Sequence, residues 1–125
     1  MQFKGAKGIY LQIAETLMDR LLGAPANPPG EDRFPPIRDT ASEFGVNPNT
    51  VGRSYALLQE RGILRNQRGI GYFVDPSARD RIIQWKKEAF LKDVLPEVFQ
   101  NMNLLNLSFR DLRREYEFYN REKNK

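Results

Sequence analysis

Residues 45–55 read GVNPNTVGRSY, and this short stretch predicts how the chain is organised. Pro48 lacks a backbone N–H and has a fixed φ, so it suits the first turn of a helix, and Asn47 suits the N-cap before it. Gly45 can adopt the left-handed conformation that ends a preceding helix. The stretch therefore predicts the end of one helix, a very short turn and the start of another helix.

Apolar side chains recur at helical spacing on both sides of this turn. They are Ile37, Ala41 and Phe44 before it, and Val51, Tyr55 and Leu58 after it. Two short helices so closely joined form a helix-turn-helix. A further helix is predicted over residues 9–22, followed by a loop over APANPPGEDRFPP (24–36), whose prolines exclude helix and central strand.

A β-hairpin is predicted after the second of these short helices. The segments ILRNQ (63–67) and YFV (72–74) favour strand, and RGIG (68–71) between them has two glycines that can take positive φ in a tight turn. Three helices followed by a hairpin are the plan of a winged helix. We therefore expect a winged helix-turn-helix domain over residues 1–75, in a chain that is mainly α.

The remaining residues, 76–125, are predicted to form two helices that mediate dimerisation. Pro96 should kink or restart the first helix, and Ser108 with Asp111 resembles a capping box that begins the second. Two helices alone cannot bury their wide apolar stripes, so a second copy of the chain is the simplest partner. The expected interface residues are Ile83, Phe90, Val94, Val98, Phe99, Leu112 and Tyr116.

Composition narrows the classes of function. The 125 residues include no cysteine and no histidine, which excludes a thiolate nucleophile, an imidazole base and an ordinary zinc or iron site. The acids are spread without an evident cleft, so we expect no enzyme activity, cofactor or metal. No apolar run reaches the ~18 residues of a membrane span, and no signal peptide opens the chain, so we expect a cytoplasmic protein without membrane contact.

The charge pattern weakly favours a polyanionic partner. The net charge is +4, yet residues 1–75 are nearly neutral, so any DNA footprint must be local. Between Lys7 and Lys86 every basic residue is arginine. The planar arginine fork suits phosphates and guanine edges.

The order of these elements and several motifs resemble the GntR family of bacterial transcription regulators, and within it the YtrA subfamily. The matching segments are IYLQI (9–13), PPG with DRFPPIRD (28–39), GVNPNTVGRSYALLQERGIL (45–64) and RGIGYFV (68–74). By position, the resemblance implies DNA contacts at Arg38, Asn47, Asn49, Thr50, Arg53, Arg68 and Gly69. It also implies a short C-terminal pair of dimerisation helices.

Two departures from the family pattern affect the helix at residues 37–44. The family usually has leucine, proline and serine before it, whereas this chain has Phe34, Pro35 and Pro36, so the serine cap is absent. Thr40 occupies a position where an apolar residue is common, and we expect it to weaken the buried face.

Each candidate on the helix from Pro48 also has a structural interpretation. Asn47 is expected mainly to cap the helix, while Asn49 and Arg53, four residues apart, share a stripe away from the apolar face and could enter one groove. Gly52 between them reflects either close approach to a phosphate backbone or simple tolerance.

The two other arginine candidates have alternatives of the same kind. Arg38 could bind a phosphate or pair with Asp39 or Glu43. Arg68 lies in a stretch with three arginines and no acid, residues 61–74, which is either a solvated edge or a contact to DNA.

The sequence thus predicts a DNA-binding repressor that acts as a homodimer on an inverted-repeat operator. The alternative is a winged-helix module that binds protein or acts as a scaffold. That module should expose neutral, apolar side chains where Asn49, Arg53 and Arg68 stand. The sequence identifies no effector ligand.

Overall fold

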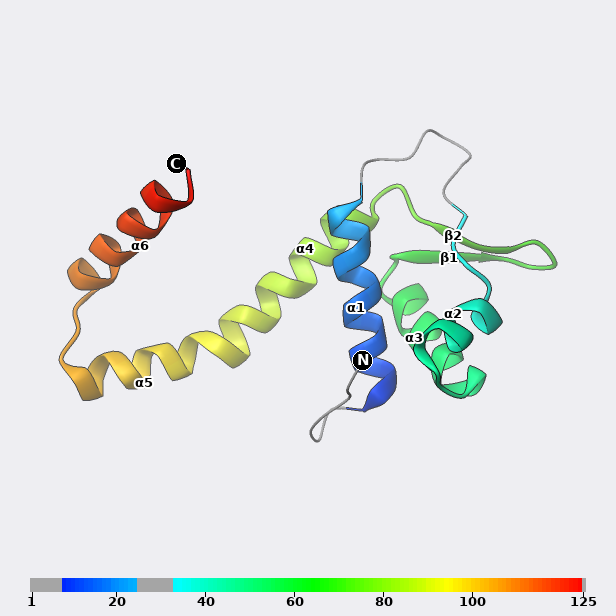
Figure 1. Ribbon diagram of the computed structural model, residues 1–125, viewed down its shortest axis with the longest axis horizontal. Helices are drawn as coiled ribbons and strands as arrows, with labels where there is room; N and C mark the ends of the chain where they lie inside the picture. The colour runs from blue at the N-terminus through cyan, green and yellow to red at the C-terminus, as the bar shows by residue number, and fades with distance from the viewer. Residues whose placement is uncertain (1–7, 25–32, 125) are drawn as a thin grey trace. The chain divides into compact units, whose positions relative to one another are not determined.

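A computed structural model describes residues 8–24 and 33–124 (Figure 1). The chain divides into two compact units, the first ending at Trp85 and the second beginning at Lys86. The elements are α1 (Ile9–Gly23), α2 (Ile37–Phe44), α3 (Pro48–Glu60), β1 (Leu64–Gln67), β2 (Gly71–Val74), α4 (Ala78–Ala89), the π-helical η1 (Phe90–Val94), α5 (Leu95–Leu105) and α6 (Phe109–Lys123). The predicted winged helix followed by further helices is confirmed.

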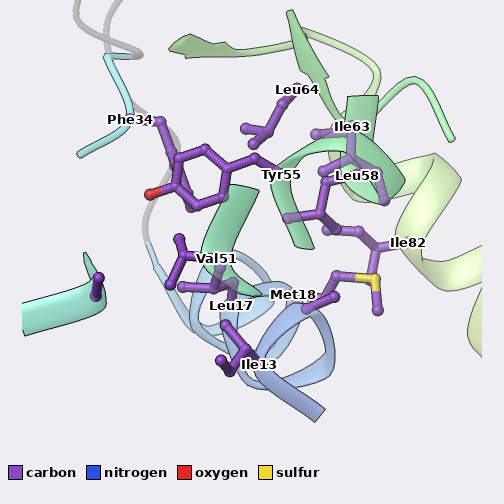
Figure 2. Packing of buried hydrophobic residues seen from close by; sticks show 13 residues of the cluster. Ile13, Leu17, Met18, Phe34, Val51, Tyr55, Leu58, Ile63, Leu64 and Ile82 are labelled. Atoms are coloured by element: carbon purple, nitrogen blue, oxygen red, sulfur yellow. The ribbon is translucent and has the colours of Figure 1, made fainter. Parts of the chain in front are cut away.

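The core of the first unit is built from one face of each helix. Figure 2 shows side chains of α1, α3, β1 and α4 converging around Tyr55, which is fully buried. The apolar face predicted for α3 is confirmed, because Val51, Tyr55 and Leu58 have no exposed surface. α1 packs against α3, and α2 lies beside α3.

The turn between α2 and α3 forms as the sequence predicts. Gly45 takes φ 66°, and the N–H of Val46 donates to the carbonyl of Ala41 at 3.1 Å, which closes α2. Pro48 then begins α3 behind the cap residue Asn47.

β1 and β2 pair antiparallel, with Leu64 opposite Val74 and Gln67 opposite Gly71. Gly69 at φ 80° and Gly71 at φ 140° supply the turn. The predicted loop before α2 falls largely on residues 25–32, which lie outside the described part of the chain together with the matching PPG motif at 28–30. Its last residues are not simply loop, because Arg33 bridges Phe73 and the Phe34 N–H donates to the Tyr72 carbonyl at 2.8 Å.

The first unit extends past residue 75, where the sequence analysis places the domain boundary. Ala78 and Ile82 of α4 are buried in its core. Arg79 donates to the Leu22 carbonyl at 2.8 Å, and the Arg61 guanidinium lies over the Trp85 ring at 4.3 Å. The start of α4 therefore completes the winged helix.

In the second unit the helix continues through Pro96 by widening into one π-helical segment. The N–H of Leu95 donates to the Phe90 carbonyl, five residues back. Proline has no N–H to give and its ring crowds the carbonyl four residues before it, so the wider turn accommodates both effects. The structure thus has a π-helical segment where the sequence analysis expected a kink or restart at Pro96.

The capping box predicted for the last helix is confirmed. The Asp111 N–H donates to Ser108 Oγ at 3.2 Å, and the Ser108 N–H donates to Asp111 Oδ2 at 2.9 Å. This backbone hydrogen bond, with that from the Ser108 hydroxyl, lowers the pKa of Asp111. Phe99 of α5 meets Phe109 of α6 edge-on, with ring centroids 6.2 Å apart.

Within residues 8–24 and 33–124, no helix is long and apolar enough to cross a membrane.

Candidate nucleic-acid interface

Helix α3 has one buried face and one exposed face. Val51, Ser54 and Tyr55 are buried, whereas Asn49 and Arg53 are exposed. Their spacing of four residues places these two side chains on the same side of the helix. The structure therefore brings an amide and a guanidinium together on the solvent side of α3, with Thr50 half-buried beside them.

Asn47 caps α3, as predicted. Its Oδ1 accepts a hydrogen bond from the Asn49 N–H at 2.8 Å, and its backbone is extended. The Asn49 side chain, in contrast, makes no hydrogen bond with any residue that the structure describes. Of the two asparagines around Pro48, the first is occupied in holding the helix and the second presents its amide to solvent.

Arg53 has a partner that the sequence analysis did not foresee. Its guanidinium carbon, Cζ, lies 4.1 Å from the centroid of the Tyr10 ring at the start of α1. Ser54, the next residue of α3, donates its hydroxyl proton to the Tyr10 carbonyl at 2.6 Å. The motif IYLQI predicts only helix and family resemblance, and no local pattern pairs Tyr10 with Arg53, because the contact joins two helices distant in sequence.

Gly52 has no packing reason to be glycine. A Cβ built on it would meet only the Ile37 Cδ1 atom, at 4.0 Å, which is ordinary contact. This proximity places the first turn of α2 against α3. Both explanations of Gly52, close approach to a phosphate and tolerance, therefore stay open.

Arg38 is exposed in the first turn of α2. It does not pair with Glu43, because Glu43 Oε1 accepts from Arg20 Nη1 at 2.8 Å. That hydrogen bond lowers the pKa of Glu43 and raises the pKa of Arg20. No ion pair joins Arg38 to Asp39 or to another described residue. As the missing serine predicts, the N-cap residue Pro36 gives α2 no side-chain cap.

The three arginines of the wing stretch differ in what they contact. Arg61 stacks on Trp85, and Arg65 Nε lies 3.6 Å from Asp75 Oδ2. Arg68 stands beside Gly69 in the exposed turn and has no ion pair or hydrogen bond among the described residues. The basic stretch thus leaves one arginine, at its tip, available to another molecule.

Arg33 is a further basic residue of the wing that the sequence analysis did not single out. Its Nη2 donates to the Ile70 carbonyl at 2.8 Å, so a residue outside the hairpin hydrogen-bonds to the turn between β1 and β2. The bridge between Arg33 and Phe73 brings the Arg33 side chain to this turn, and no local sequence pattern indicates such a pairing.

The second unit leaves most of its apolar side chains exposed. Among the expected interface residues of this unit, Phe90, Val94, Phe99 and Tyr116 are exposed and Val98 and Leu112 are half-buried. The seventh expected residue, Ile83, lies in the first unit, where it is half-buried. Leu104 is 77% exposed and Phe109 is 69% exposed, and Met102 is the one described apolar residue of this unit that is buried. Such a surface is far more apolar than a helix pair alone in water sustains.

The comparison with known families identifies this architecture. Residues 9–74 match the sequence profile described as bacterial regulatory proteins of the gntR family. The chain belongs to the GntR family. It is a transcriptional regulator with a DNA-binding winged helix, as the resemblance in its motifs implies.

Relatives extend the match beyond the winged helix. The chain is 35% identical over 107 residues to the HTH-type transcriptional regulator YhcF of Bacillus subtilis, covering 86% of this chain and 85% of YhcF. It is 31% identical over 78 residues to the repressor YtrA of the same organism, covering 62% and 58%. A crystal structure of a GntR-family regulator from Bacteroides thetaiotaomicron is 38% identical, with a TM-score of 0.76 over 92% of this chain and 99% of that one.

Proposed function

We propose that this regulator binds a specific DNA operator through α3 and the wing. The observation that carries the proposal is the exposed pair Asn49 and Arg53 on one side of α3. An asparagine amide can pair with adenine and an arginine fork with guanine in the major groove. Asn47 is excluded from this role in our assignment because its side chain already caps the helix.

Arg38, Thr50 and the wing residues Arg68 and Gly69 are assigned to the DNA backbone. Arg38 and Arg68 are exposed cations without an ion pair among the described residues. The first turn of α2 offers backbone N–H groups beside Arg38, and such groups favour phosphate oxygens. These contacts would set affinity and register, leaving discrimination between sequences to α3.

The regulator is proposed to act as a homodimer through the second unit. The exposed Phe90, Val94, Phe99 and Tyr116 support this assignment, because a second copy of the same surface would cover them. A two-fold dimer would place two α3 helices on an inverted repeat. The relative YtrA is a repressor, and its similarity supports the same direction of control and the YtrA subfamily for this chain.

A protein-binding or scaffolding winged helix is the alternative. It calls for apolar exposed side chains where DNA would lie. The exposed residues at these positions are Asn49, Arg53 and Arg68, which carry an amide and two guanidinium groups, so this alternative is less well supported.

The test is a titration of variants of the full chain against two duplexes at several salt concentrations. The first duplex is selected from a random library by the wild-type protein, and the second is a scrambled version of it. Asn49→Ala and Arg53→Ala should each reduce the preference for the selected duplex, by ~1–3 kcal/mol per lost base pairing. Arg38→Ala should leave the preference unchanged and lower the salt slope by about 0.9.

Asn47→Ala is the matched control for Asn49→Ala. It should cost ~1 kcal/mol of fold stability as a lost cap, with little effect on the preference between duplexes. Thermal melts of both variants separate the two effects. If Asn47→Ala abolished the preference while Asn49→Ala and Arg53→Ala kept it, the assignment of cap and base contact would be reversed.

A further inference from the structure

The stack of Arg53 on Tyr10 joins the start of α1 to the solvent side of α3. A distance of 4.1 Å from Cζ to the ring centroid is well inside the ~6 Å range of a favourable cation–π contact. The Arg53 N–H groups make no hydrogen bond with a described residue, so they remain able to donate to acceptors elsewhere.

Two features place Tyr10 at the start of α1. The hydroxyl of Ser54, a fully buried residue, donates to the Tyr10 carbonyl at 2.6 Å. Gly8 lies so close to the ring that a Cβ built on it would be 3.0 Å from Tyr10 Cε1. The hydrogen bond ties the Tyr10 backbone to α3, and glycine at position 8 leaves room for the ring beside it, so the ring can serve as an aromatic platform for a flexible arginine.

We infer that Tyr10 is a positioning residue for DNA recognition, which holds Arg53 in the orientation that meets a base edge. The inference rests on the proposed role of Arg53 as a base contact. An arginine free in solvent loses rotamer freedom when it binds, and one already stacked loses less. Tyr10 thus adds sequence preference without contacting a base, and α1 becomes part of the recognition surface.

Two other roles for the stack make different predictions. If the stack only packs α1 against α3, its loss should lower stability and leave the preference between duplexes unchanged. If it withdraws Arg53 from the groove, its loss should strengthen binding to the selected duplex.

The test compares Tyr10→Leu and Tyr10→Phe in the full chain, on the selected and scrambled duplexes defined above. Tyr10→Leu keeps apolar bulk and removes the π face, so the preference for the selected duplex should fall about two- to five-fold. Tyr10→Phe keeps the face and should retain the wild-type preference. Adding Tyr10→Leu to Arg53→Ala should change the preference no further, because no arginine is left to position.

Trp85→Leu is the matched control, since it removes the same kind of stack from Arg61 at the other end of α3. The Trp85→Leu variant should prefer the selected duplex over the scrambled duplex as strongly as the wild type does. Thermal melts ensure that every variant is folded at the titration temperature. A readout without DNA is the proton resonance of the Arg53 side chain, which ring current should shift upfield in the wild type and Tyr10→Phe but not in Tyr10→Leu.

The outcomes separate this inference from the function on which it rests. An unchanged preference in Tyr10→Leu, with a reduced preference in Arg53→Ala, overturns the positioning role and leaves DNA reading by Arg53 intact. Stronger binding by Tyr10→Leu also overturns it. An unchanged preference in Arg53→Ala removes the proposed base contact and the positioning role together.

Discussion

The hydroxyl groups of Thr40 and Tyr55 share a hydrogen bond of 2.6 Å in the core of the first unit. The Tyr55 hydroxyl proton is donated to the Pro35 carbonyl at 2.7 Å, so Thr40 acts as the donor to the Tyr55 oxygen. These two hydrogen bonds connect α2, α3 and the segment before α2, and each of the hydroxyl groups in them has a hydrogen-bond partner. The sequence analysis expected Thr40 to weaken the buried face, and the structure shows that Tyr55 supplies a hydrogen-bond partner for its hydroxyl.

Tyr55→Phe should destabilise the first unit by about 1–3 kcal/mol, because the Thr40 hydroxyl and the Pro35 carbonyl both lose a partner. Thr40→Val should cost less, about 0.5–1.5 kcal/mol, since the Tyr55 hydroxyl keeps its acceptor at Pro35. Denaturant unfolding of both variants measures the difference. A Tyr55→Phe variant as stable as the wild type would show that this network contributes nothing.

The same tyrosine should make stability fall at alkaline pH. Burial raises the pKa of Tyr55, so the folded state favours the neutral phenol more than the unfolded chain does. This contribution is complete below the ordinary tyrosine pKa and is lost as the pH rises through the raised folded value. Between about pH 9 and 11, the unfolding free energy of the wild type should therefore fall more steeply than that of Tyr55→Phe. Parallel curves would contradict the prediction.

Gly52→Ala should raise the stability of the first unit by ~1 kcal/mol, because alanine is the better helix former and its Cβ meets only Ile37 at an ordinary distance. A melt of the variant tests this gain. DNA titration then decides between the two explanations of the glycine. Weaker binding to both duplexes indicates close approach of a phosphate backbone, and unchanged binding indicates tolerance.

Truncation should show where the DNA-binding unit ends. A fragment that ends at Asp75 loses Ala78 and Ile82 from the core and should be unfolded or strongly destabilised, whereas one that ends at Trp85 should fold. Circular dichroism melts compare the two. If the second unit mediates dimerisation, the longer fragment should sediment as a monomer and the full chain as a dimer. A dimeric longer fragment would place the interface in the winged helix.

Arg68→Ala should weaken binding to the selected and scrambled duplexes equally and lower the salt slope by about 0.9. The reason is that Arg68 is exposed at the tip of the hairpin beside Gly69 and has no hydrogen-bond partner among the described residues, so it suits a phosphate contact that carries no sequence information. Arg65→Ala is the matched control, since Arg65 already faces Asp75 and should contribute less. A loss confined to the selected duplex would mean that the wing reads bases.

Much of the local structure followed from the sequence because short-range chemistry determines it. Gly45, Asn47 and Pro48 specify the end of α2 and the start of α3 by backbone conformation and capping alone. The Ser108 and Asp111 box and the glycines of the wing act over a few residues in the same way. The capping role of Asn47 also follows from its immediate neighbours, so Asn49 and Arg53 are the residues of α3 that are predicted to contact bases.

Which of these side chains already have partners depends on how the elements pack. Arg53 meets Tyr10, Arg33 meets Ile70, Thr40 meets Tyr55, and α4 completes the core through Ile82. Each contact joins segments separated by many residues, and neither partner carries a local pattern that names the other. Periodicity and capping report backbone conformation within a few residues, so they predict the helices and the hairpin. The pairings depend on how these elements pack in three dimensions, so they emerge only from the folded arrangement.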